Sequence, residues 1–187
     1  MPRRSHLRSL LSALAPADAV EFGHKARILQ LLSESEAPFS RTQFVPGHVT
    51  ASAFIVNQAR DALLLILHSK LGRWLQPGGH VEADDANVVC SAEREIREEV
   101  GLSDLTSNGV LDVDVHRIPA YREQPAHEHF DVRFWFTAQQ THVIAGSDAR
   151  AARWVSIADM LQPSTNGTLQ HDESVLRAVR KLSRQAP

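Results

Sequence analysis

A glycine-rich loop that runs into a strongly acidic helix is the feature that most constrains this chain. Residues 72–80 contain three glycines, and glycine allows both a sharp turn and a close approach of the backbone to a ligand. The pattern after the loop predicts a helix over residues 86–100, with Asp84 or Asp85 as N-cap and Gly101 as its end. We therefore expect a tight turn beside the start of an acidic helix.

Three glutamates share one face of that helix. Glu95, Glu98 and Glu99 stand at i, i+3 and i+4, which places their Cβ atoms about 5–6 Å apart. Carboxylates this close repel each other, and a cation among them relieves the repulsion. Oxygen ligands select hard ions, so Mg²⁺ or Mn²⁺ is expected. The alternative is a solvated charged face, on which arginines pair with glutamates four residues away.

The loop and helix together resemble the Nudix box, the motif of the Nudix hydrolases. Gly79 fits the first glycine of the motif, and the run Arg94-Glu95-Ile96-Arg97-Glu98-Glu99-Val100-Gly101-Leu102 meets every fixed position of its second half. The spacing from Gly79 to Arg94 is one residue longer than in the family, and Asp85 stands where the family has a glutamate. The resemblance implies an α/β (α+β) fold, an α/β/α sandwich around a mixed β-sheet.

The resemblance also implies roles for individual residues. It implies that the metal ligands are the carbonyl of Gly79 with Glu95, Glu98 and Glu99. Arg94 would brace these carboxylates, and Glu98 is the first choice for the catalytic base. Many family members use a further acid in the loop before the last strand, and Asp148 is the candidate here.

Two predicted strands alternate cleanly between apolar and polar side chains. Over residues 129–138 every second residue is apolar, and these are predicted to face the core: Phe130, Val132, Phe134 and Phe136. The opposite row consists of His127, His129, Asp131, Arg133 and Trp135. Residues 110–116 place Asp112, Asp114 and His116 on one side in the same way. If the two strands pair, one sheet face carries all of these polar groups.

This polar face is open to three interpretations. It could be a solvated face with cross-strand ion pairs. It could be a substrate pocket, with Arg133 on phosphate and Trp135 stacking on a base, next to His127 and His129. Lys70 and His80, at the glycine loop, could also reach phosphate, although both could equally be surface residues.

The third interpretation of the polar face is a zinc site. Imidazole and carboxylate are suitable zinc ligands. The candidates are His116, His127, His129 and Asp131. Histidines two apart on a strand share a face but need not converge, so the spacing alone does not set a metal geometry.

The pattern and the resemblance predict a division into residues 1–44, an N-terminal helical segment with a connector, and residues 45–187, a Nudix hydrolase domain. Asp18 and Glu21 have the spacing of a capping box, and the helix that follows would bury Val20, Leu29 and Leu32. These helices are expected to pack on the domain or on a second subunit, which makes a homodimer through them a candidate. Further strands are predicted over residues 49–56, 62–67 and 152–157, and a closing helix over 173–183.

Composition excludes several classes of protein. The 187 residues carry 20 Lys and Arg against 22 Asp and Glu, so no basic stripe for DNA is expected. Cys90 is the single cysteine, which rules out a disulfide framework. No apolar run is long enough to span a membrane, and the N-terminus does not read as a secretory signal. We expect a cytoplasmic protein with no membrane partner.

The predicted function is metal-dependent hydrolysis of a diphosphate linkage in a small-molecule substrate, a nucleoside diphosphate joined to another group, of the ADP-ribose or nucleotide-sugar type. A nucleoside triphosphate pyrophosphatase is one alternative. A non-catalytic Nudix-fold nucleotide-binding or regulatory module is another, although such modules usually have a broken box. An isomerase on the same fold is a third, although those need a catalytic cysteine outside the box, whereas Cys90 lies inside it.

Overall fold

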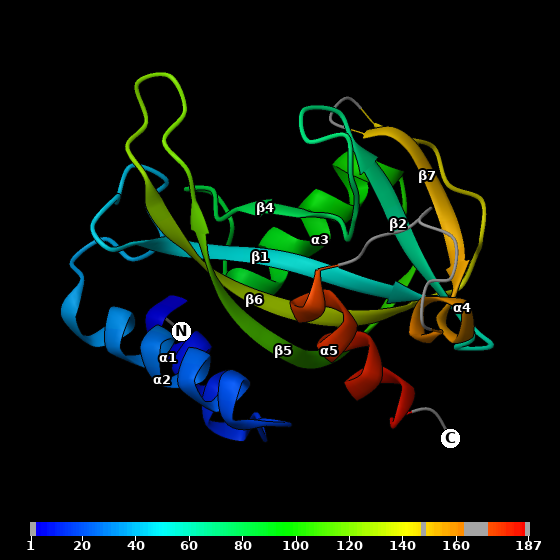
Figure 1. The fold of residues 1–187 in the computed structure, drawn as a ribbon, viewed down its shortest axis with the longest axis horizontal. Helices are drawn as coiled ribbons and strands as arrows, with labels where there is room; N and C mark the ends of the chain where they lie inside the picture. Colours follow the sequence, from blue (N-terminus) through cyan, green and yellow to red (C-terminus); the bar gives the residue numbers. More distant parts are fainter. Residues whose placement is uncertain (1–2, 147–148, 163–171, 186–187) are drawn as a thin grey trace.

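The computed structural model describes residues 3–146, 149–162 and 172–185. It has a mixed sheet with helices on both faces (Figure 1), as predicted. The helices are α1 (Arg3–Ala13), α2 (Ala19–Glu34), α3 (Val88–Val100), α4 (Ile157–Leu161) and α5 (Glu173–Ser183). The strands are β1 (Gly47–Val56), β2 (Ala62–His68), β3 (Trp74–Leu75), β4 (Gly78–His80), β5 (Leu105–Ile118), β6 (His127–Ala138) and β7 (Ala149–Ser156).

The order β3-β2-β1-β6-β5 forms the main path of the sheet, with β4 paired to β1 and β7 paired to β2. Strands β1 and β6 run parallel, whereas the other pairs are antiparallel. All ten residues of β1 are buried, as expected for a strand in the centre of a covered sheet. The predicted pairing of residues 110–116 with 129–138 is present as β5 against β6.

Two apolar cores lie on the two faces of the sheet. One contains Val132 and Phe134 of β6 and is covered by α1, α2 and α3. The other contains Phe54 of β1 and Trp135 of β6 and is covered by α4 and α5. Figure 1 shows α3 and α5 on opposite sides of the sheet. Alternation along β6 produces this division, because successive side chains point to opposite faces.

The N-terminal helices pack on the same chain. Leu7, Leu11 and Ile28 are fully buried in the core shared with the sheet, so this apolar face is not free for a homodimer. The expected buried stripe of α2 is wrong at Val20, which is 54% exposed. The division into residues 1–44 and 45–187 stays a prediction.

The start of α3 differs from the expected one. Asn87 is the N-cap, and its side chain accepts hydrogen bonds from the N–H groups of Val89 and Cys90. Neither Asp84 nor Asp85 caps the helix. The predicted end is correct: Gly101 adopts the left-handed conformation, with φ of 70°, where a side chain would be strained.

Candidate active site

A cavity of about 480 Å³ lies beside the box helix. The residues of the box that line it are Gly79, Arg94, Glu95, Glu98 and Glu99. Across from them the cavity is lined by β1, β5 and β6, through residues that include Thr50, Ser52, His116, His129 and Asp131. The fold therefore brings the acidic helix face and the polar sheet face together around one space, a size that suits a small-molecule ligand.

The glycine loop brings its backbone against two of the three glutamates. The N–H of Gly78 donates to Oε2 of Glu99 at 2.9 Å. A Cβ placed on Gly79 would collide with the carboxylate of Glu95, so a side chain at this position would displace that carboxylate. Burial raises the pKa of Glu95, against the effect of the Arg94 guanidinium. Glu98 is the most open of the three, with its side chain 57% exposed.

Arg94 ties the carboxylates to the loop. Its guanidinium bonds to Asp85 at 3.1 Å, to Glu95 at 2.9 Å and to Glu98 at 3.0 Å, and it donates to the carbonyl of His80 at 2.8 Å. These bonds raise the pKa of Arg94 further above its ordinary value, although its burial opposes this. Arg94 therefore remains a cation that offsets the charge of the acidic face.

Asp85 helps to close the segment between Gly79 and Arg94, which is one residue longer than in the family motif, into a turn. Besides its bonds to Arg94, it accepts a hydrogen bond from the N–H of Glu82 at 2.8 Å, and the N–H of Asp85 donates back to the Glu82 carbonyl. Burial disfavours its charge, but the bond with Arg94 is decisive and lowers the pKa of Asp85. The longer segment is thus closed into a turn before α3, and Arg94 keeps a buried carboxylate partner.

Arg133 does not have the predicted phosphate-binding geometry. It is 2% exposed and forms salt bridges with Asp112, Asp114 and Asp131. It also donates to the carbonyl of Ser174 on α5. With its donors taken by these groups, Arg133 holds α5 on the sheet. The cross-strand ion pairs of the first interpretation are present, but this part of the face is not solvated, since Asp112 and Arg133 are both buried.

Trp135 does not have the predicted geometry for stacking on a base. It is 8% exposed and packs in the core beneath α4 and α5. Its Nε1–H donates to the carbonyl of Asn108 at 2.9 Å. The alternation placed Trp135 on the correct face, but α5 covers that end of the face. The part of the face that lines the cavity begins at Asp131, whose oxygens accept from Thr50 at 3.1 Å and Ser52 at 2.7 Å.

Five histidines gather at the other end of the polar face. They are His48 of β1, His80 of β4, His127 and His129 of β6, and His116 of β5, with neighbouring ring centroids 5.0–5.6 Å apart. The register explains the gathering, because His48 pairs with His129, and His129 with His116. The sequence pattern indicated three of the five as possible zinc ligands. His48 joins them through the parallel pairing of β1 with β6, and His80 through the pairing of β4 with β1.

Three of these histidines have lowered pKa values. Burial lowers the pKa of His48, lowers that of His80 to about 4, and lowers that of His129 further. Mutual repulsion between the rings adds to the effect. His116 is the exception: burial disfavours its charge, but its hydrogen bond with Asp114 raises its pKa. The neutral rings of His48, His80 and His129 carry lone pairs that can act as metal ligands or as hydrogen-bond acceptors.

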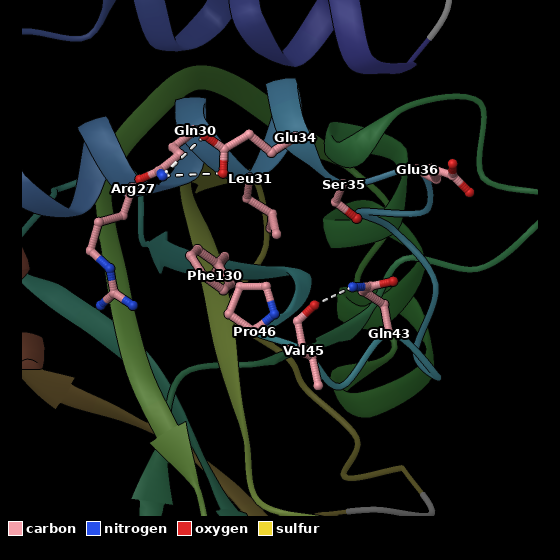
Figure 2. A pocket seen from close by; sticks show the side chains of 10 residues that line it. All are labelled: Arg27, Gln30, Leu31, Glu34, Ser35, Glu36, Gln43, Val45, Pro46 and Phe130. Atoms are coloured by element: carbon pink, nitrogen blue, oxygen red, sulfur yellow. Dashed lines mark hydrogen bonds between the residues drawn. The ribbon is translucent and has the colours of Figure 1, made fainter.

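The remaining predicted residues have different outcomes. Lys70 and His80 both line the cavity. Asp148 lies outside the described residues. A second hollow, of about 570 Å³, lies between α2 and the connector before β1 (Figure 2). It contains Arg27, Glu34 and Phe130 but none of the predicted site residues.

Comparison with known proteins agrees with the motif and the fold. The family model described as NUDIX domain matches residues 46–179. The phosphatase NudJ of Escherichia coli (strain K12) is 30% identical over 123 residues, which are 63% of this chain and 73% of NudJ. The chain belongs to the Nudix family, and it is a hydrolase that acts on pyrophosphate bonds.

Solved structures show the same fold. A NUDIX-family hydrolase from Clostridium perfringens matches with a TM-score of 0.53 and 23% identity, over 73% of this chain and 97% of that one. An Ap4A hydrolase from C. elegans matches with a TM-score of 0.55 and 18% identity, over 73% of this chain and 95% of the other. Within the described residues, we find no helix whose length and apolarity would suit a membrane span.

Proposed function

We propose that this protein uses Mg²⁺ or Mn²⁺ to hydrolyse the diphosphate linkage of a nucleoside diphosphate joined to another group, such as ADP-ribose or a nucleotide sugar. The observation that carries this proposal is the cavity itself: one space is lined by the three box glutamates, by Gly79, and by the cationic side chains of Arg41 and Lys70. Nudix enzymes generally use divalent metals, and this oxygen-rich donor set suits a hard cation.

The ligands would be Glu95, Glu98, Glu99 and the Gly79 carbonyl. When bound, the ion neutralises charge on the diphosphate and makes water more acidic. Glu98 has the most exposed side chain of the three and would accept the proton of the attacking water. Arg94 would hold Glu95 and Glu98 in place through the bonds described above. Arg41 and Lys70 would bind phosphate oxygens that lie away from the carboxylates.

A comparison of substrates tests the proposed class. ADP-ribose, a nucleotide sugar, a dinucleoside polyphosphate and nucleoside triphosphates would be assayed with Mg²⁺ and with Mn²⁺, and the products separated by chromatography. We expect a nucleoside monophosphate and a sugar phosphate as products, with the highest kcat/KM for the linked diphosphates. A higher kcat/KM for triphosphates, with release of pyrophosphate, would overturn the substrate assignment and support the triphosphate pyrophosphatase.

Lys70 offers a matched test of phosphate binding. A charge-assisted hydrogen bond contributes about 1.5–3 kcal/mol, so Lys70→Gln should raise KM by about tenfold or more while changing kcat less. Arg150→Gln, at an exposed position outside the cavity, is the control. An unchanged KM in Lys70→Gln would remove this residue from the substrate site.

The relative named a phosphatase supports a second candidate, removal of a terminal phosphate. The same assay separates the two, because inorganic phosphate would then appear without a coupled phosphatase. Release of phosphate from a triphosphate at a higher kcat/KM than cleavage of any linked diphosphate would favour this second candidate.

A further inference from the structure

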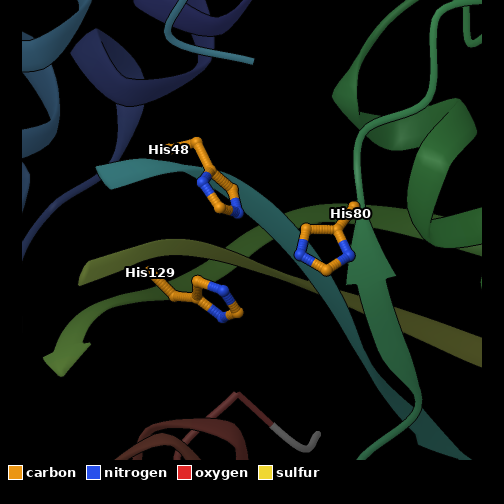
Figure 3. A group of neighbouring side chains, drawn as sticks. All are labelled: His48, His80 and His129. Carbon is orange, nitrogen blue, oxygen red and sulfur yellow. The ribbon is translucent and has the colours of Figure 1, made fainter. Parts of the chain in front are cut away.

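The box carboxylates do not account for the histidines on the other side of the cavity. His48, His80 and His129 each offer a ring nitrogen, and these three nitrogens lie within 4.8 Å of one another. Figure 3 shows the three side chains converging from β1, β4 and β6. We propose that this triad is a second metal site, separate from the carboxylate site, which takes Zn²⁺ or a similar transition-metal ion.

The strongest observation is an unsatisfied nitrogen. His48 is 1% exposed, and its Nδ1 lies 3.0 Å from the carbonyl of Gln43. A carbonyl only accepts, so Nδ1 carries the proton and Nε2 carries a lone pair. Among the described residues, the buried Nε2 has no hydrogen-bond partner. A buried polar atom without a partner is costly, and a metal ion would satisfy it.

The hydrogen bonds around His129 also determine which of its ring nitrogens carries the proton. His127 Nδ1 lies 2.9 Å from the carbonyl of Pro125, so the Nε2 of His127 is an acceptor. That atom lies 3.3 Å from Nε2 of His129, which must then donate and leave Nδ1 of His129 free. Metal-binding histidines usually have their second nitrogen held by such an outer partner, which fixes the ring and its tautomer.

The donor set determines the class of ion. Neutral imidazole suits Zn²⁺, Cu²⁺, Ni²⁺ and iron, whereas Mg²⁺ prefers oxygen. In a tetrahedral site with bonds of about 2.0–2.1 Å, the nitrogens are about 3.4 Å apart. The rings therefore need to approach by no more than about 1.4 Å. Three protein ligands leave a fourth position, which would face the cavity, because His80 and His129 line it.

This arrangement revises the zinc interpretation from the sequence. His129 remains a ligand, but His48 and His80 take the places expected for His116 and His127. His127 acts as an outer partner, and His116 bonds to Asp114 at 3.1 Å. Asp131 accepts from Thr50 and Ser52 and pairs with Arg133. The proposal does not depend on which substrate the enzyme cleaves.

Zinc titration in saturating Mg²⁺ tests the site. By calorimetry and by metal analysis after dialysis, the wild-type chain should bind one Zn²⁺. His48→Gln and His129→Gln should weaken this binding more than about 100-fold, since even outer partners contribute 10- to 100-fold. His142→Gln, at an exposed histidine outside the triad, and Glu98→Gln should retain it. Equal binding in His48→Gln and wild type, or loss in Glu98→Gln alone, would overturn the proposal.

A second measurement needs no variant, in case the substitutions disturb folding. X-ray absorption of the zinc-loaded wild-type chain, with Mg²⁺ saturating the carboxylates, should show about three imidazole ligands. A shell of oxygen ligands would overturn the triad.

Discussion

Asp112 is a residue whose role is set by its burial between two arginines. Its side chain is completely buried and accepts from Arg133 at 2.9 Å and from Arg177 at 3.1 Å. Arg133 would keep Asp114 and Asp131 as partners and Arg177 would keep Asp114, but the loss of a buried charge-assisted hydrogen bond costs about 1.5–3 kcal/mol. We expect Asp112→Asn to lower the free energy of unfolding by this order in urea denaturation. The exposed Asp104→Asn is the control, and equal stability of the two variants would contradict this account.

The lowered pKa values of His48, His80 and His129 predict that the protein loses stability in acid. The pKa of His80 is lowered from its ordinary value to about 4 by burial and by the electrostatic effect of neighbouring groups such as His48 and Arg41. Between pH of about 6.5 and 4 the unfolded chain therefore binds more protons, so stability is complete above this window and falls as the pH falls through it. His48 and His129 act in the same direction, whereas the raised pKa of His116 acts against it.

Thermal unfolding of the metal-free protein at several pH values measures this effect. The Tm should drop between pH 7 and pH 4.5, and His80→Gln should show a shallower drop than His142→Gln. A Tm that does not change across this range in the wild-type chain would contradict the prediction.

Among the elements, α3 is the one on which the site depends, and its first turn was predicted incorrectly. From the sequence, Asp84 or Asp85 was the predicted N-cap, whereas Asn87, a residue type that caps helices equally well, was missed. The tertiary bond from Arg94 takes Asp85 away from the cap. We expect Asn87→Ala to cost about 1 kcal/mol of stability and Asp84→Ala to cost little. Chemical denaturation of the two variants measures both stability losses. A larger loss in Asp84→Ala than in Asn87→Ala would contradict Asn87 as the N-cap.

The faces of strand β6 could be predicted from the sequence, but the elements that pack against them could not. Alternation along residues 129–138 placed each side chain on its correct face, because the period of a strand is local. Two facts are not local: α5 covers Arg133 and Trp135, and β1 lies parallel beside β6. Because α5 covers Arg133, this residue forms buried ion pairs instead of the predicted contact with phosphate. The parallel pairing of β1 with β6 brings His48 next to His129, and no spacing along the chain indicates that contact.

At the scale of the whole molecule, the helices outside the matched family region belong to the same core. Glu21 of α2 is fully buried and pairs with Lys181 of α5 at 2.6 Å, which links the two ends of the chain. Burial raises the pKa of Glu21, although Lys181 opposes the shift. The N-terminal segment is therefore expected to support the stability of the fold, whatever its effect on association.

A pair of substitutions measures this contribution. Leu11 of α1 is fully buried in the shared core, and a buried leucine replaced by alanine costs about 2–5 kcal/mol. Val20→Ala, at the exposed position predicted to be buried, is the control and should change stability by less than about 0.5 kcal/mol. Urea unfolding should show one cooperative transition that shifts only in Leu11→Ala. A separate early transition would mean that the N-terminal helices unfold independently of the domain.

The glycine loop, the box helix and the hydrolase class were predicted from the sequence, because the motif is contiguous and its chemistry is local. The measurement that tests the central claim most directly is turnover of ADP-ribose and nucleotide sugars with Mg²⁺, with Mn²⁺ and with chelator, in wild type, Glu98→Gln and Glu93→Gln. We expect turnover that needs metal, falls by a factor of about 100 or more in Glu98→Gln without a change in Tm, and persists in Glu93→Gln. Wild-type rates in Glu98→Gln, or turnover in chelator, would contradict the account.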